Sequence, residues 1–176
     1  LFQLNELSIY MGLGAALLIL LYPLAKRFLA IPQTILGLAF SFGIPIAFAS
    51  QDNLSLITWV IFLANFLWVI AYDTVYGMID AADDEKLDIG NSARYFGRRK
   101  EKWVFLLGLA HLFIYFFVGL SLNLDLSFFF FLSLFFGIVF FQNFQINLGL
   151  RQIYLSIFKG NNWIGVFLFF GILFGF

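Results

Sequence analysis

The sequence predicts an all-α membrane protein, a bundle of several transmembrane helices. Hydrophobic residues make up 62% of the 176-residue chain and charged residues only 11%, against about 25% charged in an average soluble domain. Apolar runs long enough to cross a bilayer, ~20 residues each, recur along the chain. Because lipid offers no hydrogen-bond partners to the backbone, these runs must be helices rather than isolated strands. The absence of cysteine excludes disulfides and thiolate chemistry.

The chain divides into six expected spans. The first ends where Tyr22 and Pro23 interrupt the apolar run. The second begins at Pro32, a residue suited to a first helical turn, and should be kinked by Pro45. The third leads into an acidic segment, a basic segment precedes the fourth, and the fifth is rich in phenylalanine, which we expect to face lipid or pack between helices. The six spans lie at about residues 7–21, 32–50, 56–71, 103–120, 127–144 and 163–176.

Basic residues segregate along the chain. Every Lys and Arg lies in an odd-numbered connection: Lys26 and Arg27 in the first, those between residues 86 and 102 in the third, and Arg151 and Lys159 in the fifth. The positive-inside rule therefore predicts that these connections are cytoplasmic and that both chain ends lie on the opposite side. The formal net charge is zero and gives no sign of a nucleic-acid partner.

Carboxylates concentrate immediately after the third span. Closely spaced carboxylates are hard oxygen ligands, and Mg²⁺ bound by one or two of them completes its octahedron with water and phosphate oxygens. Residues three or four apart share a helix face, so several of these side chains can converge. The alternative interpretation is a solvated loop beside the membrane. The six acids, which fall within sixteen residues, are Asp73, Asp80, Asp83, Asp84, Glu85 and Asp88.

Residues 72–97 read YDTVYGMIDAADDEKLDIGNSARYFG. This run resembles the second aspartate-rich motif of the UbiA-type polyprenyltransferases, YDTxYAMxDRxDDxxIGIKSTAxLFG, in particular that of the 4-hydroxybenzoate polyprenyltransferases of ubiquinone biosynthesis. Residues 22–49 are similar to the family's preceding loop and helix, with its YxxxK element at Tyr22 and Lys26. The segments FLANFLWVIAYDT and, more weakly, NNWIGVFLFFGI extend the resemblance over essentially the whole chain.

The resemblance implies Mg²⁺-dependent transfer of a polyprenyl group from its diphosphate to the 3-position of 4-hydroxybenzoate, in a bacterial inner membrane. It places Asp80 and Asp84, supported by Asp83, as ligands of a diphosphate-bound Mg²⁺. Asp73 would orient the aromatic substrate or assist the metal. Residues 72–102 would form a cytoplasmic active-site loop in a single domain of residues 1–176. The remaining site residues are Lys26, expected to pair with the diphosphate, Tyr22 beside it, and Tyr72, Tyr76 and Arg94 as substrate-binding residues.

Three of the departures from the family motif change the charge. Ala81 stands where the motif has Arg, Asp88 where it has Gly, and Gly90 where it has Lys. These replacements remove two cations and add an anion. They would weaken diphosphate affinity or transfer the binding task to Lys86 or Arg94.

The family's other aspartate-rich motif, NDxxDxxxD, has no match, since the only acids before Tyr72 are Glu6 and Asp52. The resemblance therefore implies the C-terminal part of the enzyme, about six of nine helices, with little or no transferase activity alone. Two alternatives remain: a prenyltransferase of the same superfamily with another aromatic acceptor, and a cation-coupled transporter. A transporter would be expected to carry its ionisable residues in mid-membrane, whereas these acids follow a span. Membrane lipids are expected partners in each case.

Overall fold

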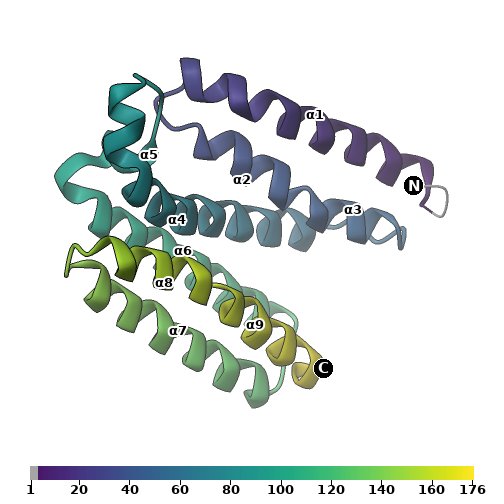
Figure 1. Cartoon of the computed structure of the whole chain (residues 1–176). Helices are drawn as coiled ribbons and strands as arrows, with labels where there is room; N and C mark the ends of the chain where they lie inside the picture. The colour runs from purple at the N-terminus through teal and green to yellow at the C-terminus, as the bar shows by residue number, and fades with distance from the viewer. Residues whose placement is uncertain (1–3) are drawn as a thin grey trace.

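The computed structural model describes residues 4–176, and every regular element in that range is helical. Figure 1 shows the long helices lying side by side and antiparallel, with both chain ends at the same end of the bundle. The elements are α1 Glu6–Phe28, α2 Gln33–Ser41, α3 Gly43–Ala49, α4 Leu56–Lys86, α5 Ser92–Phe96, the 3₁₀ turn η1 Gly97–Arg99, α6 Lys100–Ser121, α7 Leu126–Ile146, α8 Arg151–Gly160 and α9 Asn162–Gly175.

The predicted multi-span helical bundle is confirmed. In the described part of the chain, five helical stretches are long and apolar enough to cross a membrane. The remaining expected span, residues 32–50, corresponds to the shorter apolar segment Gln33–Ala49. Its length is near the lower limit for crossing a bilayer, about 17 residues.

Two prolines have different effects on their helices. The prediction that the first span ends at Pro23 was wrong, because α1 continues to Phe28 and its last turn is closed by a 2.8 Å hydrogen bond from Leu29 N to Ala25 O. One lost backbone hydrogen bond does not break a long membrane helix whose other groups stay paired. Pro45, by contrast, lies in the first turn of α3, and the helix is interrupted just before it, at Phe42. The interruption removes the clash between the proline ring and the preceding turn.

Helix α4 is the central element of the bundle. It was expected to end near Ala71 but continues to Lys86, so most of the acidic segment is helical rather than a loop. Its 31 residues correspond to about 46 Å, longer than the ~30 Å hydrocarbon core of a bilayer. The helix packs against α2, α3, α5, α6 and α8 (Figure 1). The acidic end of α4 therefore extends past the apolar span while staying attached to its neighbours.

The last span also differs from the prediction. The residues before position 163 were assigned to a connection, but Arg151–Gly160 forms helix α8, which leads directly into α9. Tyr154 and Ile157 are buried and lie three residues apart on one face of α8, against α4 and α7. Because the helix buries only this one face, its sequence lacks the continuous apolar run of a membrane span.

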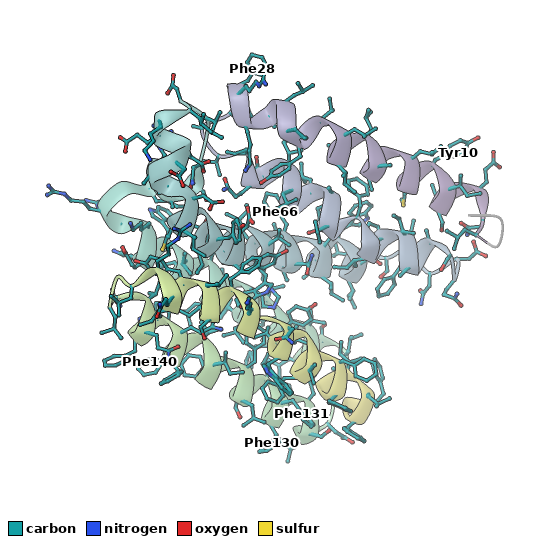
Figure 2. The ribbon with its side chains drawn as sticks, viewed as in Figure 1. Tyr10, Phe28, Phe66, Phe130, Phe131 and Phe140 are labelled. Atoms are coloured by element: carbon teal, nitrogen blue, oxygen red, sulfur yellow. The ribbon has the colours of Figure 1, made fainter. Side chains whose placement is uncertain are left out.

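The phenylalanines occupy both of the expected environments. Phe128 and Phe135 are almost completely buried in the core between α4, α6, α7 and α9. Phe131 lies between α7 and α9, whereas the Phe130 and Phe140 rings point away from the bundle (Figure 2).

Gly119 sets the spacing of α6 and α7 at one end of this core. A Cβ atom there would lie 2.4 Å from Cε1 of the buried Phe128 ring. We expect Gly119→Ala to destabilise the fold by about 1–3 kcal/mol, since overpacking a rigid core costs about that much. Gly137→Ala in α7 is the matched control because a Cβ there meets no atom within 4 Å. Thermal unfolding in detergent measures the difference, and equal midpoints for both variants would contradict this packing.

Candidate functional site

Side chains from the last turns of α1 lie within electrostatic range of acids in the second half of α4. The Lys26 ammonium lies 5.5 Å from the centre of the Tyr22 ring. It is also near enough to Asp73 and Asp80 to interact electrostatically with both carboxylates. These two acids are seven residues apart, close to two helical turns, and therefore share a face of α4. Asp84 joins them in the electrostatic environment of Tyr22. The structure thus brings together the predicted Tyr22, Lys26 and three of the predicted acids.

Asp84 is buried and tied to the start of α5. Asn91 Nδ2 donates a 2.6 Å hydrogen bond to Asp84 Oδ2 and a 2.9 Å bond to the carbonyl of Gly77. The other oxygen of the same amide accepts a 2.8 Å bond from Ala93 N, as the N-cap of α5. A Cβ at Gly77 would lie 2.6 Å from Asn91 Oδ1, so only glycine allows this approach. One asparagine therefore fixes both the carboxylate and the connection between α4 and α5.

Gly90 brings the same connection against the end of α1. Its N–H donates a 2.6 Å hydrogen bond to the Lys26 carbonyl. A Cβ at Gly90 would lie 1.8 Å from the carbonyl oxygen of Leu29, so the backbone would have to move to admit any side chain. The family's lysine therefore does not fit this packing.

Arg94 has a supporting position at the end of α4. Its Nη1 donates hydrogen bonds to the backbone oxygens of Asp84, at 3.1 Å, and Ile89, at 2.7 Å. The Asp84 carbonyl also accepts a 3.1 Å bond from Ile89 N, so Arg94 reinforces the turn that follows α4. Substrate binding by Arg94 stays a prediction, and Nη1 already serves the backbone.

Gln33 and Ser92 are site residues that the sequence analysis missed. Gln33 Oε1 accepts a 3.1 Å hydrogen bond from Ser92 N, and its side chain lies close to the Asp73 carboxylate. The hydroxyls of Ser92 and Thr74 are 2.8 Å apart. These buried contacts join α2, α4 and α5. The sequence signal for them was weak, because single polar residues at helix ends are also common as caps.

Helix α8 adds a cation and an aromatic ring that were also missed. Arg151 is close enough to Asp80 to interact electrostatically. The Phe158 ring centre lies 5.8 Å from that of Tyr72 and 4.9 Å from that of Tyr76. The predicted pair of tyrosines is therefore one side of an aromatic cluster. The spacing of the apolar residues in α8 could have revealed it, had the segment been read as a helix.

Asp83 pairs with Lys86 and not with the residues around Lys26. Its exposed carboxylate forms a 3.0 Å salt bridge with Lys86, one turn later on α4. A supporting role for Asp83 in metal binding stays a prediction. Between residues 4 and 176, no three His, Cys, Asp or Glu side chains are arranged to hold a metal by themselves. Asp80 and Asp84 as ligands of Mg²⁺ likewise stay a prediction, since an ion bound by one or two carboxylates takes its other ligands from water and phosphate oxygens.

The interaction between Asn91 and Asp84 predicts a measurable opening of this region. Asn91→Ala would leave a buried carboxylate without its donor, at a cost of about 1–3 kcal/mol. We expect faster amide hydrogen exchange in residues 87–96 of this variant. Asn162→Ala, at the exposed start of α9, is the control. Unchanged exchange in the Asn91 variant would show that this hydrogen bond does not hold the connection.

Comparison with known proteins gives one consistent result. The UbiA prenyltransferase family profile matches residues 1–152. A 4-hydroxybenzoate octaprenyltransferase of Tolumonas auensis is 39% identical over 97% of this chain and 60% of its own length. The enzymes of that name from Aeromonas salmonicida and Nitrosomonas eutropha are 40% and 41% identical over 96% and 97% of this chain, and 59% and 60% of their own lengths. The chain thus spans about three fifths of these relatives. No solved structure matches it.

Proposed function

The chain belongs to the UbiA prenyltransferase family, as the 72–97 motif predicted, and we propose that it serves the transfer of a polyprenyl group from polyprenyl diphosphate to the 3-position of 4-hydroxybenzoate. The relatives that carry this activity in their names support the choice of substrates. Within the superfamily, they favour this acceptor over other aromatic rings. The basic residues at the site end of the bundle support an orientation with the site on the cytoplasmic side of a bacterial inner membrane.

The observation that carries the proposal is the meeting of Tyr22 and Lys26 from α1 with Asp73 and Asp80 from α4. These groups lie where apolar helices end, at the depth where a lipid-borne diphosphate reaches water. Lys26 can pair with phosphate oxygens as a point charge. The carboxylates repel a diphosphate unless a cation lies between them, which is why the proposal includes a divalent metal ion, as this family generally uses.

Each side chain has a task in the proposed reaction. Asp80 and Asp84 would hold Mg²⁺, which when bound neutralises the charge that builds on the departing diphosphate. Lys26 would bind the same diphosphate as it leaves with the electron pair of the C–O bond. The electron-rich ring of 4-hydroxybenzoate then attacks the allylic carbon and loses the proton from its own carbon. Asp73 would orient the acceptor.

The aromatic cluster of Tyr72, Tyr76 and Phe158 supports a second part of the mechanism. Positive charge develops on the allylic carbon as the diphosphate departs. Aromatic faces attract a cation by about 0.5–2 kcal/mol, and more strongly when water is excluded. The cluster is adjacent to Asp73 along α4, so it can shield the developing cation from water while the ring attacks.

Substitution of the acids tests the proposal in an active background. The chain would be joined to the N-terminal portion of the Tolumonas auensis relative and assayed in membranes with a polyprenyl diphosphate, 4-hydroxybenzoate and Mg²⁺. We expect Asp80→Asn and Asp84→Asn each to lower turnover about 100-fold or more, the usual effect of removing transition-state charge stabilisation. Glu101→Gln, on the same side of the membrane, is the control. Normal turnover in both aspartate variants would refute the assigned roles.

Protection from protease separates an enzyme from a transporter. Trypsin cleaves after Lys86, Arg94 and the arginines that follow, all within or beside the site. We expect slower cleavage of the purified chain only when Mg²⁺ and a prenyl diphosphate are added together, because each completes the binding of the other. Asp80→Asn should remove this protection. Protection by the cation alone would favour a cation site in a transporter instead.

A further inference from the structure

A second cavity lies beside the candidate active site, on a different face of α4. It is open to the surface, has a volume of about 840 Å³ and is lined by the end of α1, the C-terminal turns of α4, the 87–91 connection, α5 and the start of α6. Tyr22, Lys26, Asp73 and Asp80 do not line it. Its size is within the range of small-ligand sites, roughly 300–1,000 Å³. The proposed prenyl transfer makes no use of this space.

All three charge-changing departures from the family motif line this one cavity. Ala81 and Gly90 take the places of the motif's two cations, and Asp88 takes the place of its glycine. The short side chain of Ala81 leaves space where a long basic side chain would stand, whereas Gly90 admits the close approach of the end of α1. Asp88 adds an anion at the edge of that space. These changes alter the charge and size of the second cavity, and they leave the acids beside Lys26 in place.

Charged groups of both signs face the cavity without neutralising one another. Three cations, Arg27, Arg94 and Lys100, and two anions, Glu85 and Asp88, line its wall. Among the described residues, the one salt bridge is that between Lys86 and Asp83, outside the cavity. Opposite charges that line one space without pairing are complementary to a ligand that carries both a negative and a positive group.

Exposed apolar side chains border the cavity. Its wall includes Leu29 and Tyr95, of which Tyr95 is 62% exposed. The neighbouring Phe28 and Leu87 are 82% and 70% exposed, at the ends of α1 and α4. Large apolar side chains at the end of membrane-spanning helices are suited to contact with lipid chains, and adjacent basic residues attract lipid phosphates. A headgroup in the cavity would have its acyl chains along these exposed groups.

We propose that this cavity binds the headgroup of a zwitterionic phospholipid with a primary amine, such as phosphatidylethanolamine. Arg27 and Lys100 bind the phosphate, and Glu85 and Asp88 accept hydrogen bonds from the ammonium group. Arg94 contributes charge, while its Nη1 stays on the backbone of the 84–89 segment. The primary amine matters because it donates hydrogen bonds to carboxylates, which a quaternary choline cannot do. This inference is independent of the proposed prenyl transfer.

Lipid competition tests the proposal on the full chain. The purified protein would be equilibrated with equal amounts of phosphatidylethanolamine, phosphatidylglycerol and phosphatidylcholine, and retained lipid would be counted by native mass spectrometry. We expect phosphatidylethanolamine to be enriched about threefold or more over the other two, the ratio that two or three additional weak charge-assisted hydrogen bonds supply. Equal retention of all three lipids would overturn the proposal.

Substitutions in the cavity wall test whether the lipid binds there. Glu85→Gln with Asp88→Asn should abolish the preference for phosphatidylethanolamine over phosphatidylglycerol, because only the ammonium contacts are lost. Asparagine tolerates the left-handed backbone of residue 88, whose φ is 50°. Arg27→Gln with Lys100→Gln should lower retention of both lipids. Arg98 is a neighbouring basic residue outside the cavity wall, so Arg98→Gln is the control. If Arg98→Gln lowered lipid retention equally, the effect would be due to general surface charge, and the proposed site would be wrong.

A soluble headgroup analogue tests whether the ligand is a membrane lipid or a free phosphate ester. Glycerophosphoethanolamine has the phosphate and the amine without acyl chains. We expect it to displace the lipid only weakly, because the exposed apolar groups beside the cavity contribute to lipid binding. Displacement at the same concentration as the lipid itself would show that the ligand is a soluble phosphate ester and would overturn the assignment to a membrane lipid.

Discussion

The continuity of helix α4 is the constraint on which the rest of the structure depends. Its backbone hydrogen bonds run from the apolar span into the acidic segment without a break, from Leu56 to Lys86. A helix fixes the angle between successive side chains at about 100°, so the direction of each acid is set by its number. Asp73 and Asp80 consequently lie on the side of Lys26, while Ala81 and Glu85 line the second cavity, where Asp88 joins them from the connection after the helix. Two neighbouring sites with different chemistry thus result from one rigid element.

Charge balance explains why other helices converge on this element. Carboxylates near the membrane repel one another and are costly to remove from water unless cations or hydrogen-bond donors approach them. Lys26 and Arg151 bring positive charge from α1 and α8, which are far apart in the sequence. Asn91 supplies the neutral donor for the buried Asp84. The site is therefore a meeting of separate chain segments around one acidic helix face, and its remaining negative charge suits a metal ion.

Two glycines, Gly77 and Gly90, determine where the connection after α4 lies. Gly77 admits the Asn91 amide and Gly90 admits the end of α1, each at a distance that a Cβ atom would prevent. The departure from the family motif at residue 90 thus has a steric cause in this chain. Ala81 lies on the adjacent cavity wall, where the same loss of a long side chain leaves space. The positions that predict a weakened diphosphate site in the sequence also line the second cavity.

The sequence by itself determined the fold class, the approximate spans and the identity of the acidic motif, because hydrophobicity over ~20 residues and helical spacing are local properties. It also identified Tyr22 and Lys26, though only through the resemblance to a family. The local sequence pattern predicted the wrong end for α1 and too short a helix for α4, and it did not predict α8. Packing against neighbouring helices outweighs the helix-breaking tendency of a single proline or a polar stretch. Only the tertiary structure decided that Gln33, Asn91, Arg151 and Phe158 belong beside the acids and that Asp83 turns away. Contacts between residues distant in the chain depend on how helices pack, which no local pattern encodes.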